Sequence, residues 1–492
     1  MTSSSSRSTS PSILRLAVTT AVGLFFALIM IATAKTGPTH SKVVVCYIAT
    51  WAVYRPGKGS YSIENFDPSL CTHVVYAFAG LNATTHDSIV SLDPWQDLKD
   101  NYGKNGFERI TNLRRTHPHL KVSLAIGGWN EGSANYSMMA ADANKRTRFV
   151  KQVTSFIRFH KFDGLDLDWE YPTQRGGKSY DRENFVSLTK ELRQEFDKHG
   201  LILTSAIGAA KHVMDEAYDF KSLTKYLDFL HIMCYDYGGS WDRKVGANAP
   251  LTGDGPLNIK FTIDYIIKSG AMPSKIVLGV PFYGRTFVTN NEGNLGDVSD
   301  DQGFKGPFTR ENGFLGYNEI CAELSNKSTG WTRTFDEDTN QAIIRLRDEA
   351  KQETKVVTYD DSRAMANKMR FAVEKSLGGI MVWSIDTDDF LGECQVDSSL
   401  TETFVDFGKT PGVQLSIPKR ISGNYPLLRT INEGLILAED EIDQEYQIKR
   451  KQQEEDRENE IPHGEDNIIN NSAPSILTNA WILVLVCLYR LF

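Results

Sequence analysis

Four acidic residues in one short segment are the side chains best placed to do chemistry in this sequence of 492 residues. Asp163, Asp166, Asp168 and Glu170 fall within residues 162–172, where only Leu and Trp separate the last three. On a β-strand, a spacing of two places those three side chains on one face of the sheet. Carboxylates lined up inside a fold are costly unless they share protons and hydrogen bonds. The pattern therefore predicts an acidic row for proton transfer, with Glu170 as the candidate general acid.

A calcium-binding loop is the alternative explanation for such a run of acids. Calcium loops place Gly, Asn and Ser between their acidic ligands, whereas apolar residues stand between the acids here. The ten histidines are scattered, and no spacing of Cys and His fits a metal site. The sequence also contains no glycine-rich phosphate loop. We therefore favour the catalytic row and expect neither a metal nor a cofactor.

The elements that must position the acidic row alternate between strand and helix patterns. Helical patterns such as residues 146–160 and 182–199 separate short apolar strands. The expected strands are residues 43–48, 73–78, 121–126, 162–168, 201–207, 229–234, 276–280 and 379–383. This alternation predicts an α/β fold, a (β/α)8 TIM barrel. Because active sites lie at the C-terminal ends of barrel strands, Glu170, the last acid of the row, should reach the substrate.

Two segments fall outside this alternation. The gap between the seventh and eighth strands is too long for one βα connection, so residues 289–363 are interpreted as a small inserted α+β subdomain. Residues 409–470 are rich in charge, above all after residue 438, and lack a sustained apolar heptad. They are interpreted as a charged linker or stalk, either a solvated helix or a disordered segment. The catalytic barrel is therefore expected over residues 35–408.

Both ends of the chain resemble processing signals. Two arginines precede an apolar run that ends in A-T-A, so residues 1–34 are expected to be a signal peptide, with an uncleaved signal anchor as the alternative. Residues 471–492 combine small polar residues, a short spacer and an apolar tail, as glycosylphosphatidylinositol signals do. The tail is short for a membrane-spanning helix, which stays open as an alternative. We expect a secreted protein that a lipid anchor holds on the outer cell surface.

Composition agrees with a large secreted enzyme. A net charge of −8, with no long cluster of Lys and Arg, argues against nucleic acid as a partner. The hydrophobic content of 41% is sufficient for a sizeable core. Asn82, Asn135 and Asn326 begin N-glycosylation tripeptides, which fit a secreted glycoprotein.

Several motifs of this chain resemble those of the chitinases of glycoside hydrolase family 18. The acidic segment reads FDGLDLDWEYP and is similar to the family signature DxxDxDxE. Four further motifs match in order: LKVSLAIGGWN at 120–130, MCYDYGGSW at 233–241, GVPFYGRTF at 279–287 and GGIMVWSIDTDDF at 378–390. The match covers residues 42–407, and the insertion departs from the family pattern. The resemblance implies a TIM barrel with an inserted subdomain that cleaves chitin.

The resemblance implies substrate-assisted hydrolysis with retention of anomeric configuration. Glu170 would protonate the glycosidic oxygen, and Asp166 and Asp168 would share a proton behind it. The acetamido carbonyl of the sugar would attack its own anomeric carbon. Asp168 would orient and stabilise that group, with help from Tyr235 and Asp236.

The resemblance also implies a set of sugar-binding residues. Trp383 would form the floor beneath the distorted sugar ring. Trp129 and Trp51 would stack on sugars toward the non-reducing side, and Trp241 toward the reducing side. The other residues expected to line the site are Tyr47, Phe78, Gly128, Met233, Tyr283, Arg285 and Met381. Trp51 and Trp241 could equally be ordinary aromatics, packing is as good an explanation for Phe78 and Met381, and Gly128 could serve close chain approach.

Six cysteines fit an oxidising compartment. Cys234 lies in an apolar strand and is expected to be a buried free thiol, and the sixth cysteine falls in the C-terminal tail. The four that remain allow three connectivities. The resemblance implies that Cys46 pairs with Cys71 and Cys321 with Cys394.

Two functions from different classes remain. The first is an active chitinase, expected to be endo-acting and monomeric, that binds chitin and N-acetylglucosamine oligomers. The second is a non-catalytic chitin-binding lectin or chitinase-like signalling protein on the same barrel. Family members that bind without cutting commonly lack the acidic Glu, so the presence of Glu170 favours the enzyme. An endo-β-N-acetylglucosaminidase acting on glycoproteins is a minor enzymatic alternative.

Overall fold

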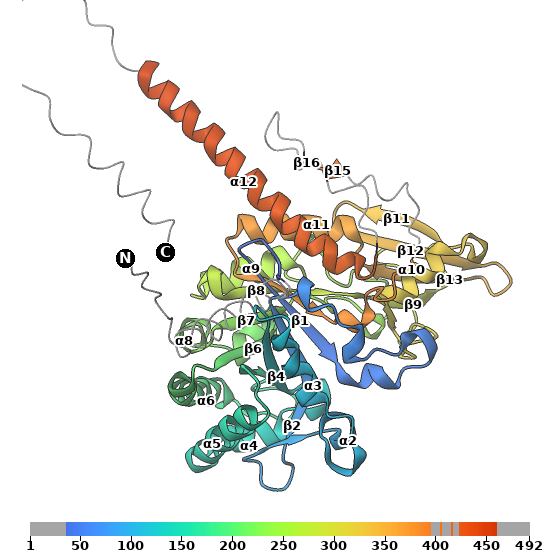
Figure 1. Ribbon diagram of the computed structural model, residues 1–492. Helices are drawn as coiled ribbons and strands as arrows, with labels where there is room; N and C mark the ends of the chain where they lie inside the picture. Colours follow the sequence, from blue (N-terminus) through green and yellow to red (C-terminus); the bar gives the residue numbers. More distant parts are fainter. Residues whose placement is uncertain (1–35, 395–403, 406–414, 417–422, 460–492) are drawn as a thin grey trace, which may run out of the picture. The chain divides into compact units, whose positions relative to one another are not determined.

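Eight parallel strands form a closed barrel in the computed structural model, which describes residues 36–394, 404–405, 415–416 and 423–459 (Figure 1). The strands are β1 (Val43–Ala49), β2 (His73–Leu81), β4 (Lys121–Gly127), β5 (Gly164–Asp168), β6 (Ile202–Gly208), β7 (Phe229–Met233), β8 (Ile276–Pro281) and β14 (Gly379–Trp383). β1 pairs with β14 on one side and with β2 on the other, which closes the barrel. A short strand, β3 (Ile89–Ser91), pairs antiparallel with β2. The predicted (β/α)8 TIM barrel is confirmed.

The barrel strands are buried along nearly their whole length. In β1 every residue after Val43 is buried, and all five residues of β5 are buried. Strands that are enclosed by helices outside and by side chains inside read as near-continuous apolar runs. Any polar side chain on the inner face of β5 must therefore find its partners inside the barrel.

Helices surround the barrel and connect its strands. They are α2 (Pro94–Asp97), α3 (Gly106–Asn112), α4 (Ala134–Ala141), α5 (Ala143–Phe159), α6 (Asp181–Phe196), α7 (Lys211–Ala217), α8 (Phe220–Tyr226), α9 (Ile259–Lys268) and α11 (Ser362–Glu374). In α5, Phe149, Val153 and Ile157 recur every four residues and are buried. Asp142 caps this helix, because its carboxylate accepts a hydrogen bond from the amide of Asn144 at 2.7 Å.

A second, five-stranded antiparallel sheet lies between β8 and β14 in the chain (Figure 1). Its elements are β9 (Tyr283–Thr289), β10 (Phe314–Gly316), α10 (Tyr317–Ser325), β11 (Thr332–Asp336), β12 (Gln341–Asp348) and β13 (Glu353–Tyr359). The sheet thus begins before residue 289, where the insertion was expected to start. β9 follows β8 after a single residue, so its apolar pattern reads as a continuation of the seventh barrel strand.

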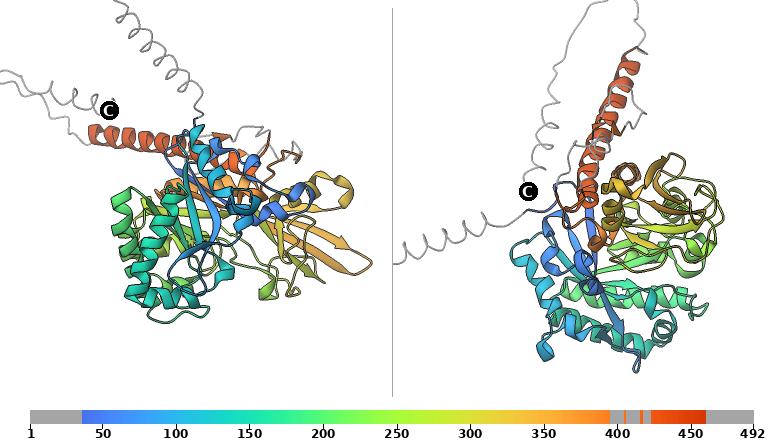
Figure 2. Two further views of the ribbon diagram at one scale, coloured as in Figure 1. Left: turned by 60° about the horizontal axis from the view of Figure 1, so that its bottom comes forward. Right: turned by 90° about the vertical axis from the view of Figure 1, so that its right-hand side faces the viewer.

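Helix α12 (Pro426–Asn459) begins within the expected linker 409–470. Its residues up to Asp443 belong to the same compact unit as the barrel. The buried apolar side chains of this part are Leu427, Leu428, Ile431, Leu435 and Ala438. Arg370 of α11 forms a buried ion pair with Glu441, and α12 starts beside α11 (Figures 1 and 2). The first half of α12 therefore serves as the helix after the eighth strand, and the barrel domain extends beyond residue 408.

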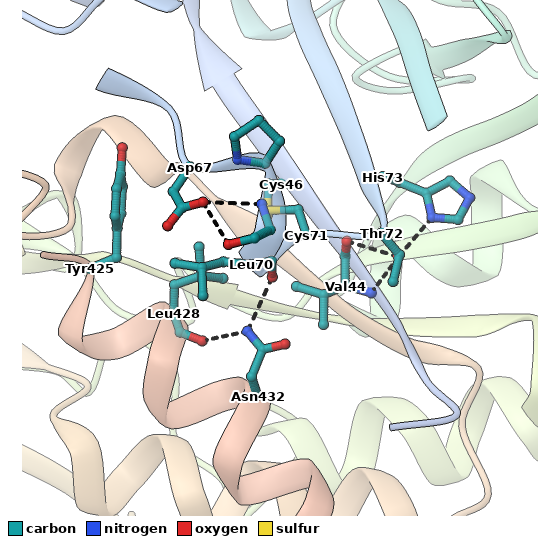
Figure 3. The surroundings of a disulfide bond; sticks show 12 residues. Val44, Cys46, Asp67, Leu70, Cys71, Thr72, His73, Tyr425, Leu428 and Asn432 are labelled. Atoms are coloured by element: carbon teal, nitrogen blue, oxygen red, sulfur yellow. Dashed lines mark hydrogen bonds between the residues drawn. A yellow bond between two sulfur atoms is a disulfide. The ribbon is translucent and has the colours of Figure 1, made fainter. Parts of the chain in front are cut away.

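Two disulfides link elements of this domain. Cys46 of β1 pairs with Cys71, and Cys321 of α10 pairs with Cys394. Figure 3 shows the first pair beside α12, where the Asn432 side-chain amide donates to the carbonyl of Leu70 at 3.1 Å. Both pairings are those that the family resemblance implies. Cys234 is a buried free thiol, as expected.

The remaining described residues add little to the barrel. β15 (Phe404–Val405) and β16 (Leu415–Ser416) form a two-stranded antiparallel sheet. The expected signal peptide 1–34 and tail 471–492 lie outside the described residues. Within the described part of the chain, the search for a helix both long enough and apolar enough to cross a bilayer finds none.

Candidate active site

The acidic segment runs along β5 and just beyond its C-terminal end. Asp166 and Asp168 lie within the strand, and Glu170 follows two residues after its end. Their exposed fractions rise outward from 0% for Asp166 to 5% for Asp168 and 9% for Glu170. Asp163 precedes the strand and has a separate role, because it accepts the amide of Val122 at 2.7 Å and pairs with an arginine outside the barrel.

Asp166 is the anchor of the row and is surrounded by hydrogen-bond donors. The hydroxyl of Tyr47 donates to its Oδ2 at 2.7 Å, and the hydroxyl of Thr204 donates to its Oδ1 at 2.6 Å. His231 Nδ1 lies 3.2 Å from Oδ1 and 2.8 Å from the Tyr47 hydroxyl. Three barrel strands thus contribute one partner each: β6, which pairs with β5, the next strand β7, and β1 from across the barrel. These contacts fix the orientation of the Asp166 side chain inside the barrel.

Asp168 and Glu170 favour their protonated forms. Burial, together with the charges of Glu170 and Asp166, raises the pKa of Asp168 well above its usual value. Oδ1 of Asp168 is buried without a hydrogen-bond partner. Burial raises the pKa of Glu170 to about 7, against the opposing effects of a hydrogen bond from Tyr171 and the charge of Arg175. A carboxylic acid with this pKa can give up a proton near neutral pH.

Tyr235 and Asp236 follow the C-terminal end of β7, which is separated from β5 by β6. Burial is the main cause that raises the pKa of the Tyr235 hydroxyl, so this group stays protonated and can donate. Asp236 accepts from the Tyr283 hydroxyl at 2.7 Å and from Arg285 Nε at 2.8 Å. Asp236 is thus held by two residues of β9, which belongs to the inserted sheet.

A group of stacked aromatic rings lies at the ends of β1, β2 and β14. Trp51 stacks on Phe78 with ring centroids 6.0 Å apart, and Phe78 stacks on Trp383 at 5.8 Å. Trp383 also contacts Tyr47 edge-on at 5.7 Å. Trp51 is 45% exposed, so part of its surface remains available to a ligand. Flat faces of this kind suit the apolar faces of sugar rings.

The other predicted lining residues fall into exposed and packed groups. Trp129 and Trp241 are 58% and 52% exposed, and Arg285 lies 4.9 Å from the Trp241 ring centroid. Met381 is buried within the barrel, with Met233 packed against the same apolar cluster. A side chain at Gly128, where φ is +87°, would meet the Phe78 ring at 2.8 Å. The absence of a side chain at Gly128 therefore permits the close approach of Phe78.

Three residues around the acids are absent from the sequence-based prediction. Thr204 and His231 contact Asp166, and Arg175 contacts the main chain of Glu170. His231 has a signal in the sequence, since it precedes Met233 and Tyr235 at the same spacing of two. Thr204 and Arg175 have none, because an isolated Thr in a strand or Arg in a loop is ordinary. Among the described residues, no group of three or more metal-binding side chains is arranged to hold an ion.

Comparisons with known proteins identify the family of this chain. A model of the glycosyl hydrolases family 18 matches residues 43–388. The chain is 62% identical over 448 residues to "Probable chitinase 2" of Drosophila melanogaster, covering 90% of each. The chain belongs to glycosyl hydrolase family 18.

Solved structures of the family superimpose on this barrel. The Ostrinia furnacalis Group IV chitinase in complex with allosamidin has a TM-score of 0.70 and 38% identity, covering 81% of this chain and 99% of that chain. Human YKL-39, described as a pseudo-chitinase with retained chitooligosaccharide binding properties, has a TM-score of 0.67 and 30% identity, covering 80% and 99%.

Proposed function

We propose that this protein is a chitinase that hydrolyses β-1,4 linkages between N-acetylglucosamine units, with the acetamido group of the substrate as nucleophile. The observation that carries the proposal is Glu170, whose pKa is raised by burial to about 7 at the end of β5. Similarity to proteins named chitinases supports the substrate class. The pseudo-chitinase relative makes chitin binding without cleavage the competing function.

The mechanism follows from the order of the acids along β5. Protonated Glu170 gives its proton to the glycosidic oxygen as the bond to the anomeric carbon breaks. The acetamido carbonyl oxygen attacks that carbon, and an oxazolinium ion forms. Water then attacks the same carbon and opens this ring, so that the configuration is retained overall. Asp168 stabilises the charge that develops on the acetamido nitrogen, while the Tyr235 hydroxyl donates to the carbonyl oxygen. Glu170, now a carboxylate, takes a proton from the attacking water.

Asp166, Asp236 and the aromatic rings complete the proposal. Asp236, held by Tyr283 and Arg285, helps to position the acetamido group. Asp166, held by Tyr47, Thr204 and His231, keeps Asp168 in place and takes part in sharing its proton. The partner of the protein is then a chain of N-acetylglucosamine units, whose rings stack on the exposed tryptophans. The exposed fractions of Trp51, Trp129 and Trp241, between 45% and 58%, support this role.

Hydrolysis of N-acetylglucosamine tetramer, followed by NMR, tests the activity. We expect the first products to carry the β-anomer at the newly formed reducing end, because substrate assistance retains configuration. Binding of the tetramer without cleavage would instead identify a chitin-binding lectin. Allosamidin, present in the Ostrinia structure, should inhibit if the two sites are alike.

Substrates without the acetamido group test the nucleophile. Fully deacetylated chitosan oligomers and cellulose oligomers of equal length should stay uncut, because they lack the carbonyl that attacks the anomeric carbon. A stable thiazoline analogue of the intermediate should inhibit the cleavage of the acetylated tetramer. Turnover of the cellulose oligomer would contradict the mechanism.

The termini lead to a proposal about location. A signal peptide over residues 1–34 and a lipid-anchor signal over 471–492 would place the enzyme on the outer cell surface, where the polymer is. Phosphatidylinositol-specific phospholipase should release activity from expressing cells into the medium. Activity that stays on the cells would indicate a membrane helix, and activity that is soluble beforehand would indicate no anchor.

A further inference from the structure

Arg175 connects two loops that carry proposed site residues. It follows Glu170 by five positions, in the connection between β5 and α6. Its guanidinium carbon lies 3.5 Å from the ring centroid of Trp129, which follows β4. Its Nη1 donates to the main-chain carbonyl of Glu170 at 2.9 Å. One side chain therefore contacts both a candidate sugar-stacking ring and the backbone of the candidate acid.

Contact with Arg175 leaves one face of Trp129 for a ligand. A guanidinium at 3.5 Å is in van der Waals contact with the ring, so a sugar cannot occupy the same face. Trp129 is nevertheless 58% exposed. The main chain supports the arrangement, because the carbonyl of Arg175 accepts from the amide of Ser133 at 3.3 Å, and the Ser133 hydroxyl donates to the carbonyl of Tyr171 at 2.6 Å.

The charge of Arg175 also acts on the acid. Around Glu170, burial and the charge of Asp236 raise its pKa, whereas the hydrogen bond from Tyr171 and the charge of Arg175 lower it. The titratable groups that interact with Glu170 are Asp168, Tyr171, Arg175, Tyr218, Tyr235 and Asp236. Among the causes of the Glu170 shift, Arg175 supplies the positive charge.

We propose that Arg175 is a positioning residue that holds Trp129 as a one-sided stacking platform and keeps a positive charge beside Glu170. The inference rests on the proposed chitinase activity. It gives Arg175 two separable effects, one on substrate binding through the ring and one on the acid through charge. A lysine can supply the charge but not the planar contact, and a methionine supplies neither.

Kinetics of Arg175→Met and Arg175→Lys in the full-length protein separate the two effects. With the N-acetylglucosamine tetramer, we expect Arg175→Met to raise KM about threefold. The alkaline limb of its kcat profile should move upward by about half a pH unit, because Glu170 must be protonated and has lost a neighbouring cation. Arg175→Lys should raise KM about twofold but leave the limb near its wild-type position.

Arg115→Met is the matched control. Arg115 is exposed in η6 (Leu113–Arg115), ahead of β4 and thus at the opposite end of the strands from Glu170. This variant should match the wild type in KM and in its pH profile. An unchanged limb in Arg175→Met, or an equal effect of Arg115→Met, would overturn the inference. A lower kcat and a lower thermal midpoint in Arg175→Met, with the alkaline limb of its pH profile unchanged, would mean that Arg175 has only a structural role. A wild-type protein that cuts no tetramer would instead refute the proposed function.

Discussion

At the residue scale, the environment of each carboxyl group decides its role. Asp166 accepts hydrogen bonds from Tyr47 and Thr204 and lies 3.2 Å from His231 Nδ1. Asp168 has a buried oxygen without a partner, and Glu170 is buried beside other acids. The proposed roles follow from this difference: Asp166 anchors the row, Asp168 lies between, and Glu170, just beyond the strand, is the candidate acid. Burial is the main cause that raises the pKa of both Asp168 and Glu170.

Glu170→Gln tests the acid directly. The substitution preserves shape and removes the proton, so we expect kcat for the tetramer to fall by roughly 10²-fold or more. Binding of the oligomer, measured by calorimetry, should persist. Glu183→Gln, at an exposed position of α6, provides the same chemical change away from the site and should leave kcat unaltered. A Glu170→Gln enzyme with wild-type turnover would exclude this residue as the acid.

The pH profile provides a second check on Glu170. Its pKa is raised to about 7, chiefly by burial. Since the acid works only when protonated, kcat should decline as pH rises through about 7. Steady-state kinetics with the tetramer between pH 4 and 9 would show this limb. A rate that stays constant up to pH 9 would mean that another group donates the proton.

At the element scale, the loop after β14 connects the site to α12. Trp383 ends β14, and five residues later Asp388 accepts hydrogen bonds from the amide of Leu428 at 3.0 Å and of Leu427 at 3.4 Å. The first turn of α12 is thus capped from the loop that follows β14, the strand that ends in the proposed sugar-binding ring of Trp383. Burial raises the pKa of Asp388 to about 7.

The stability of this junction should depend on pH. The pKa of Asp388 is about 7 in the folded state, compared with ~3.9 for an unperturbed Asp. Its stabilising contribution is complete below pH ~4 and is lost as pH rises toward 7. In urea unfolding, the free energy of unfolding of Asp388→Asn should fall less between pH ~4 and ~7 than that of the wild type. The amide keeps an acceptor for the cap but does not titrate.

Asp388→Ala is the comparison that isolates the cap. Alanine removes both the titration and the acceptor, so it should lower the free energy of unfolding by ~1 kcal/mol relative to Asp388→Asn. Equal pH dependence in the wild type and in Asp388→Asn would show that other buried acids, and not Asp388, control stability in this range.

At the scale of the whole molecule, the barrel requires a helix after its eighth strand. Leu427, Leu428, Ile431 and Leu435 of α12 are each at most 1% exposed. Full burial of such a side chain stabilises by ~1.5–3 kcal/mol, so the four together contribute several kcal/mol. That is a large part of the ~5–15 kcal/mol by which a domain is stable.

Truncation tests where the domain ends. A protein that ends at residue 408 lacks α12, and we expect it to give little soluble protein or to aggregate. A protein that ends at residue 443 keeps the buried half of α12 and should match the full chain in thermal midpoint and tetramer hydrolysis. The yield of soluble protein and the midpoint by calorimetry distinguish the two. Equal stability of the shorter protein would show that α12 is dispensable.

Features that depend on local periodicity can be predicted from the sequence. A spacing of two along β5 places Asp166, Asp168 and Glu170 in one row, and alternating strands and helices define the barrel. Residues 426–443 are harder to interpret, because their apolar residues alternate with charges and lead into a highly charged segment. Read by composition, they are a linker; only the barrel supplies the apolar surface that buries their leucines.

Tertiary structure alone decided the contacts between distant parts of the chain. Thr204 and His231 reach Asp166 because the barrel brings β6 and β7 alongside the acids, and Arg175 reaches Trp129 because two loops meet at the same strand ends. The inserted sheet likewise brings Tyr283 to Asp236. The spacing of side chains along one strand or helix is a property of that segment and can be recognised in its sequence. Closure of the barrel depends on all eight strands at once, and no single segment encodes it.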